Sequence, residues 1–319
     1  SMVKLGGAGT MIHISEAANS RRNRLIFRCV LEFLLDEGRR LIDRHGGGFT
    51  RGVVHMAVAQ ASRSPGGNVR GGISVRAIAQ SLGLAYETTR RQVAVLESAG
   101  LVSRAGDSGV TTAAGAPAPP LAWDLERCEG LRRLIADLKG LGYAFDPGPG
   151  ATPQRDEDLA APLGALLDAF ILRVLEAGVA PYGSMLDALI FSGLITTNAG
   201  DITYDRELAQ KYAWSNSPPP DELRRPVTIA ELSERLGLHH ETIRRHVVRY
   251  VAQGYVARTP GGYLSSMSRQ QSPEILQGGQ IIVQRFLQLV QAARQMGLDV
   301  EAISPNVRAP TRRGVTLAT

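Results

Sequence analysis

The fold is decided by a motif that the sequence contains twice. Residues 74–104 read SVRAIAQSLGLAYETTRRQVAVLESAGLVSR, and residues 228–258 read TIAELSERLGLHHETIRRHVVRYVAQGYVAR. The stretches align without a gap at an offset of 154, and 11 of their 31 positions are identical. The identities include two glycines and a T-x-R-R run, which unrelated amphipathic helices would not share in register. The chain therefore contains an internal duplication.

Weaker similarity extends the repeat on both sides. Residues 25–38 and 169–178 both carry Val-Leu-Glu on an amphipathic pattern, and residues 131–145 pair with 286–300. Each repeat is therefore expected to contain two leading helices, the motif and a closing helix. This plan divides the chain into a first repeat, a Pro/Gly-rich linker, a second repeat and a mobile basic tail, at residues 20–145, 146–158, 159–302 and 303–319. The longer connection at 200–226 receives no role.

The motif itself predicts two short helices and a hairpin. Gly83 and Gly237 stand where the first helix would end in the left-handed conformation, and residues 86–98 and 240–252 form the second helix. The predicted buried stripes of these second helices are Thr89, Val93 and Leu96 in one copy and Ile243, Val247 and Tyr250 in the other. Alternating residues at the end of each copy, 101–104 and 255–258, predict strands, and the turns that follow them close a hairpin.

Two helices joined by a glycine turn and followed by a hairpin are typical of a winged helix–turn–helix. The sequence LGLHHETIRRHV followed by GYVAR resembles bacterial winged-helix transcriptional regulators of the deoxyribose-operon repressor type. The flanking helices are more similar to the multiple-antibiotic-resistance regulators. The resemblance implies a mainly α fold with short β-hairpin wings, in which tandem winged helix–turn–helix repeats pack through their flanking helices. It also implies that residues 86–98 and 240–252 are recognition helices.

Side chains opposite the buried stripes are suited to reading DNA. Arg and Gln can contact base edges in a bidentate manner, Thr and His reach bases or phosphates, and a wing arginine suits the backbone or minor groove. The predicted DNA-binding residues are Tyr86, Thr88, Arg90, Arg91, Gln92 and Arg104 in the first copy, and His240, Thr242, Arg244, Arg245, His246, Arg249 and Arg258 in the second. An alternative for each single arginine is that it only solvates an exposed helix.

The charge of the chain fits a polyanionic partner. The formal net charge is +6, and only three of the 36 basic residues are lysines. Residues 86–104 hold three Arg and two Glu, a net charge of +1, whereas residues 240–258 hold four Arg and one Glu, a net charge of +3. We therefore expect the second copy to make the stronger DNA contact.

Other functional classes find little support in the sequence. His239, His240 and His246 lie close together in the sequence, but only His239 and His246 fall on roughly one helical face. Without a nearby Cys or a clear third ligand, we predict no metal site and no cofactor. No catalytic motif is present, so an enzyme is not expected. The two cysteines, Cys29 and Cys128, fit a reducing compartment, and the apolar stretches read as buried helices rather than membrane spans. These features indicate a cytoplasmic, nucleoid-associated protein.

The preferred hypothesis is a transcriptional regulator that binds double-stranded DNA through two recognition helices of one chain. The helices at 25–42, 131–141, 163–176 and 280–296 would pack into a shared centre, so that a monomer imitates a dimer; a homodimer of tandem repeats stays open. The alternatives are a winged-helix protein-interaction scaffold and a plasmid-type replication initiator. A small-molecule effector is also left open, with Trp123 and Trp214 as candidate pocket residues or core residues.

Overall fold

The computed structural model describes residues 23–63, 72–106, 109–214 and 217–308. Over these residues the protein is mainly helical, with two small antiparallel sheets. The elements of the first half are α2 (Asn23–Arg44), α3 (Phe49–Arg63), β1 (Ile73–Ser74), α4 (Val75–Ser81), α5 (Tyr86–Ser98), β2 (Val102–Ala105), β3 (Gly109–Thr112) and α6 (Leu121–Gly140).

The second half repeats this order and adds short helices. Its elements are α7 (Asp156–Tyr182), α8 (Met185–Asn198), α9 (Gly200–Thr203), α10 (Arg206–Lys211), the 3-10 turn η1 (Asp221–Leu223), α11 (Ile229–Leu236), α12 (His240–Ala252), β4 (Val256–Thr259), β5 (Gly262–Ser265), α13 (Met267–Gln270) and α14 (Pro273–Gln295).

Each copy of the motif folds as a helix, a tight turn, a second helix and a hairpin. We call α4, α5, β2 and β3 the first motif unit, and α11, α12, β4 and β5 the second. Gly83 and Gly237 have φ of +61° and +65°, a conformation that glycine adopts at little cost. The bounds of α5 and α12 and their buried stripes agree with the sequence-based prediction.

Local hydrogen bonds explain why the motif helices start where they do. The Ser74 hydroxyl accepts a hydrogen bond from the Ala77 amide at 3.1 Å. In the second unit Thr228 and Glu231 form a reciprocal capping box, as the T-x-x-E pattern predicts. The strand β1 pairs with β3 to give the order β1-β3-β2, and an antiparallel bridge between Val227 and Tyr263 stands at the corresponding place in the second unit.

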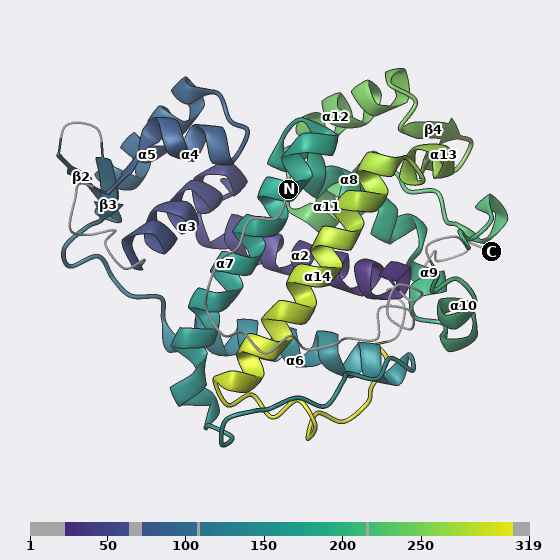
Figure 1. Cartoon of the computed structure of the whole chain (residues 1–319). Helices are drawn as coiled ribbons and strands as arrows, with labels where there is room; N and C mark the ends of the chain where they lie inside the picture. Colours follow the sequence, from purple (N-terminus) through teal and green to yellow (C-terminus); the bar gives the residue numbers. More distant parts are fainter. Residues whose placement is uncertain (1–22, 64–71, 107–108, 215–216, 309–319) are drawn as a thin grey trace, which may run out of the picture.

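The centre of the molecule is a bundle that both halves build together. Helix α14 packs along α7 and α2, and α6 packs against the same two helices (Figure 1). Their apolar side chains belong to one continuous core, which includes Phe33 of the first half and Leu163 and Phe286 of the second. The two expected domains therefore share a core.

The two leading helices, α2 and α7, each reach the motif unit of the other half. Glu32 of α2 forms an ion pair with Arg235 of α11, and Glu176 of α7 accepts a hydrogen bond from Ser81 of α4. Ser81 and Arg235 are equivalent in the aligned motifs, and the two glutamates belong to the repeated Val-Leu-Glu. This crossed packing fixes both motif units to one frame.

The connection at 200–226 contains α9, α10 and η1, and it closes the start of α2. The Ala213 carbonyl accepts hydrogen bonds from the amides of Arg24 and Leu25, at 3.1 and 3.3 Å. These are amides of the first helical turn, which have no acceptor within their own helix. The additional length of the second half therefore caps a helix of the first.

The predicted linker and the start of the predicted mobile tail both contact the bundle. In the linker, Arg294 donates to the Asp146 carbonyl at 2.7 Å, and the Arg294 carbonyl accepts from the Ala151 amide at 3.0 Å. The expected mobile tail does not begin at residue 303, because Arg308 forms an ion pair with Asp137 of α6 at 2.7 Å. Residues 309–319 of that predicted tail lie outside the described residues.

The long apolar stretches form α7 and α8, whose side chains are largely buried in the bundle. Within the ranges given above, no helix has both the length and the apolar character that crossing a membrane requires.

Candidate nucleic-acid interface

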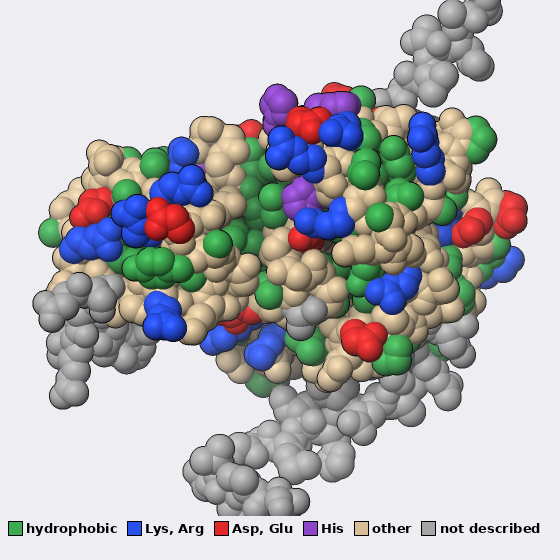
Figure 2. All heavy atoms as spheres, turned by 90° about the horizontal axis from the view of Figure 1, so that it is seen from above, with side chains coloured by type: hydrophobic (Ala, Val, Ile, Leu, Met, Phe, Trp, Pro, Cys, Tyr) green, Lys and Arg blue, Asp and Glu red, His purple; other side chains and the backbone are tan. Residues whose placement is uncertain are grey.

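The helices α5 and α12 lie on the same side of the molecule, at the top of Figure 1. Figure 2 looks down on that side and shows basic side chains gathered in two separate groups, one over the first motif unit and one over α12. Because the crossed packing holds both units on one bundle, the two groups are presented together. A long polyanion lying on this face could contact both of them.

Two exposed arginines in these groups, Arg90 and Arg244, occupy equivalent positions and make equivalent ion pairs. Arg90 binds Glu87 at 2.6 Å, and Arg244 binds Glu241 at 2.7 Å, each three residues away on the same helix. Arg245 also contacts Glu241, at 3.2 Å. The hydrogen bonds from Arg244 and Arg245 lower the pKa of Glu241 to about 2. Such exposed pairs are weak, so a phosphate can replace the carboxylate at little cost.

Other predicted residues are exposed without such an intrahelical partner. Arg91 of α5 and Arg258 of β4 are exposed, and neither forms an ion pair with a residue that the structure describes. Arg104 of β2 contacts Glu97 at 3.3 Å. Tyr86 and His240, at the equivalent first positions of α5 and α12, are exposed as well. These side chains can reach a ligand without rearrangement of the core.

The prediction that His246 faces the groove is wrong in this structure, because its side chain is 17% exposed and turns toward α8. Arg249 contacts the same helix but stays 47% exposed, so its role at the interface stays a prediction. The ring of His246 lies 2.6 Å from the Asp187 carboxylate, which Arg249 also contacts. The Tyr250 hydroxyl donates to the same carboxylate at 2.6 Å. Asp187 is buried, and a buried carboxylate requires hydrogen-bond donors. Although burial opposes the effect, hydrogen bonds from His246, Tyr250 and Ser184 hold the pKa of Asp187 below its ordinary value.

The prediction that Gln92 faces the DNA groove is also wrong. This residue is equivalent to His246, and its side-chain oxygen accepts a hydrogen bond from Arg51 of α3 at 3.4 Å. In both units this helical position therefore faces the second leading helix, α3 or α8, rather than solvent. Thr88 and Thr242 are half-buried at the edge of the exposed face.

The sequence reasoning missed several exposed residues of this surface. Arg76 of α4 lines a shallow hollow with Tyr86 and Arg104, so three elements of the first unit converge there. In α12, Val248 and Val251 are 49% and 36% exposed, although both side chains are apolar. Their position outside the buried stripe is the signal that identifies them from sequence.

The histidines and tryptophans considered for ligands have separate structural roles. His239 caps α12 by accepting a hydrogen bond from the Glu241 amide at 3.3 Å. In the described part of the chain no three His, Cys, Asp or Glu side chains form a group that could hold a metal ion. Trp123 lines a cavity, and the guanidinium carbon of Arg44 lies over its ring, 4.7 Å from the ring centre. Trp214 packs against the core.

The geometry thus defines a face with two similar helices, each carrying exposed arginines and followed by a basic hairpin strand. Comparison with family models, curated proteins and solved structures finds no match to the chain.

Proposed function

We propose that this protein is a sequence-specific double-stranded DNA-binding protein of the transcriptional-regulator class, with two winged helix–turn–helix units in one chain. The observation that supports this most directly is the presentation of α5 and α12 on one side of a shared bundle, with exposed arginines at equivalent positions. Regulators with this motif place two recognition helices in successive major grooves, about 34 Å apart. In this proposal one chain supplies both helices as a pseudo-dimer.

The exposed arginines of the two motif units have different roles in the proposed complex. Arg91, Arg244 and Arg245 project from the helices toward base edges and phosphates, and Arg104 and Arg258 of the hairpins contact the backbone beside the groove. Release of Glu87 and Glu241 from their arginines accompanies binding. The arginines keep their full charge, so counterion release from DNA supplies a large part of the affinity.

The two halves of the bound site are expected to differ in sequence. Tyr86 stands in α5 where His240 stands in α12, and Arg104 contacts Glu97 whereas Arg258 has no ion pair within the described ranges. A tyrosine and a histidine offer different groups to a base. We therefore expect a DNA site of two parts whose sequence is not palindromic.

The exposed valines favour a second candidate, a protein-interaction scaffold. Val248 and Val251 lie one turn apart on α12 beside the arginines, and Val95 is 41% exposed on α5. In DNA complexes such side chains contact thymine methyl groups. On a scaffold they would form part of a protein interface.

A salt titration separates the two candidates. Binding of the purified chain to fluorescent duplex DNA is measured by anisotropy over a series of salt concentrations. A protein that contacts several phosphates loses affinity steeply, with a linear dependence of log affinity on log salt. Absence of binding at low salt, or affinity that is insensitive to salt, would reject DNA as the partner and leave the scaffold.

A further inference from the structure

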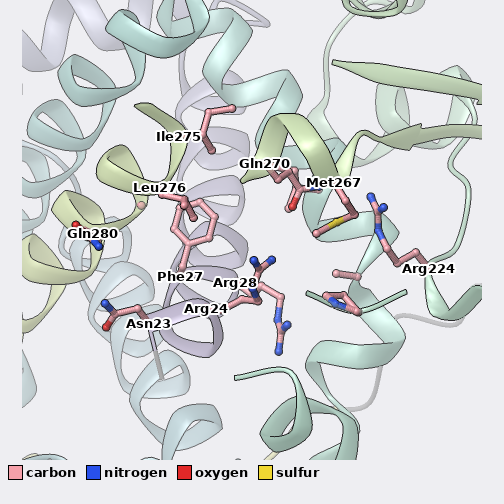
Figure 3. A pocket seen from close by; sticks show the side chains of 14 residues that line it. Asn23, Arg24, Phe27, Arg28, Arg224, Met267, Gln270, Ile275, Leu276 and Gln280 are labelled. Atoms are coloured by element: carbon pink, nitrogen blue, oxygen red, sulfur yellow. The ribbon is translucent and has the colours of Figure 1, made fainter. Parts of the chain in front are cut away.

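A cavity lies at the start of α2, between α8, α13 and the beginning of α14. It spans about 700 Å³, including the part open to solvent. One side is apolar, formed by Phe27, Leu276 and Met267, and the other carries Arg24, Arg28 and Arg224. Figure 3 shows the side chains of Arg24 and Arg28 next to each other, close to Phe27.

Arg28 is a buried cation for which the described residues provide no counter-ion. Its residue exposure is 3%, and one guanidinium nitrogen donates to the Tyr212 carbonyl at 3.2 Å. The other two nitrogens have no hydrogen-bond partner in the described chain. Burial, together with the charge of Arg24, lowers the pKa of Arg28 to about 10, so the group still carries its charge at neutral pH. An uncompensated buried charge is strongly unfavourable, which makes this arrangement unusual.

The groups that contact the neighbouring arginines do not supply the missing negative charge. Arg24 donates to the Trp214 carbonyl at 3.3 Å. Arg224 contacts the carboxylate of Asp221 at 2.6 Å and the Ser265 carbonyl at the end of β5. The side chain of Asp221 is 66% exposed and is held by Arg224. The cationic side of the cavity therefore retains positive charge beside an apolar surface.

The first half contains a cavity at the corresponding place, in which Arg63 and Arg127 have carboxylate partners. When α2 and α7 are aligned on Val-Leu-Glu, Asp168 takes the position of Arg24. Asp168 binds Arg63 at 3.0 Å and Arg127 at 2.9 Å, and Arg127 binds Glu37 at 2.6 Å. The same framework thus holds these ion pairs in one half and, in the other, the buried Arg28, for which the described residues provide no counter-ion.

We propose that the cavity beside Arg28 binds a small amphipathic anion. Its carboxylate or phosphate head accepts hydrogen bonds from the two unpartnered nitrogens of Arg28, with Arg24 adjacent, and its apolar body lies against Phe27 and Leu276. Guanidinium groups recognise both heads through paired hydrogen bonds. The mixed apolar and polar lining, with few convergent donors, is typical of small-molecule sites. The inference does not depend on DNA binding.

The test uses the full chain without DNA and three probes with the same eight-carbon tail: octanoate, octyl phosphate and 1-octanol. Binding is followed by thermal unfolding and by isothermal titration calorimetry. We expect at least one of the two anions to bind saturably and to raise the melting temperature, and the alcohol to have a much smaller effect. The ratio between octanoate and octyl phosphate identifies the preferred head group.

Two variants and one control locate the site. Arg28→Met removes the charge at similar length; we expect it to weaken anion binding by at least about tenfold and to raise the melting temperature of the ligand-free protein, because a buried charge is lost. Gly279→Met places a side chain toward Phe27 in the cavity without altering an arginine, and it also blocks binding. Arg63→Gln changes the corresponding cavity of the first half and leaves binding unchanged.

Three results would each overturn the proposal. One is the absence of saturable binding of both anions, and another is equal binding of octanoate and 1-octanol. The third is undiminished anion binding in both Arg28→Met and Gly279→Met.

Discussion

The helices α5 and α12 each pack against the helix that precedes their motif unit, but the polar contacts between the helices differ in the two halves. Helix α12 is held to α8 by the buried Asp187, which has His246, Arg249 and Tyr250 as partners. At the same place in the first half, a single 3.4 Å hydrogen bond joins Arg51 of α3 to Gln92. The corresponding position serves as an ionic anchor in one half and a weak polar contact in the other.

The cavity beside Asp168 and the cavity beside Arg28 also differ in how their charges are paired, but here the first half has the stronger ion pairs. In the cavity of the first half, Arg63 and Arg127 are paired with Asp168 and Glu37. The cavity of the second half leaves Arg28 without a counter-ion in the described chain. Each half therefore satisfies charges at one place and not at the other. Within a common backbone plan, side-chain differences at equivalent positions therefore decide whether a charge is paired inside the protein or left for the proposed ligand.

The largest expected effect is at the anchor of α12. Asp187→Ala leaves His246 and Arg249 without their buried carboxylate partner and leaves the Tyr250 hydroxyl only the backbone carbonyl of residue 187 as acceptor. We therefore expect a loss of about 3 kcal/mol in the free energy of unfolding. Arg51→Ala removes the hydrogen bond to Gln92 and a second one, to the His45 carbonyl at 3.2 Å, but leaves no buried charge unpaired, so we expect a loss of about 1 kcal/mol. Urea unfolding of both variants measures the difference. Equal losses would show that the two contacts are equivalent after all.

The next effect concerns the proposed DNA contacts of the two units. Replacement of both Arg244 and Arg245 by Ala is expected to weaken DNA binding about thirtyfold and to lower the salt slope by about two. The matched pair Arg90 and Arg91, replaced in the same way, is expected to cost about fivefold, because the first unit carries less net positive charge. Anisotropy titrations on the same duplex provide both numbers. A larger loss for the first pair would reverse the ranking of the units.

The smallest expected effect is the pH dependence of stability that arises from His45 in the cavity of the first half. Burial, with the nearby His55 and Arg44, lowers the pKa of His45 in the first cavity to about 4, from an ordinary value near 6.5. The unfolded chain therefore takes up this proton first, and stability is lost as the pH falls from 6.5 toward 4. The expected cost is about 1 kcal/mol at about pH 5.5. Melting temperatures of His45→Gln should depend less on pH, whereas the exposed control His240→Gln should behave like the parent protein.

Much of the motif could be predicted from the sequence. The ends of α5 and α12 follow from the glycines and from the spacing of Val93 and Val247, because these signals are local. The capping box at Thr228 and the hairpins follow in the same way. The exposed arginines of the predicted site were identified because they lie opposite the buried stripe.

The remainder depends on contacts between distant segments. Periodicity shows which side of α2 or α7 is apolar, but not that each helix crosses to the opposite motif unit. His246 and Gln92 lie beside the buried stripe, where a polar residue can face either solvent or a partner. The signal for the partner of His246 was Asp187, a lone acid in an apolar helix that must find donors when buried.

Selection of binding sites from random duplex DNA by the purified protein tests the central claim most directly. The bound sequences give the symmetry of the site, and the mass of the complex gives the number of chains. We predict a site of two unlike parts, about one turn of the DNA helix apart, occupied by a single chain. Enrichment of only perfect palindromes, or the absence of any enriched sequence, would contradict it.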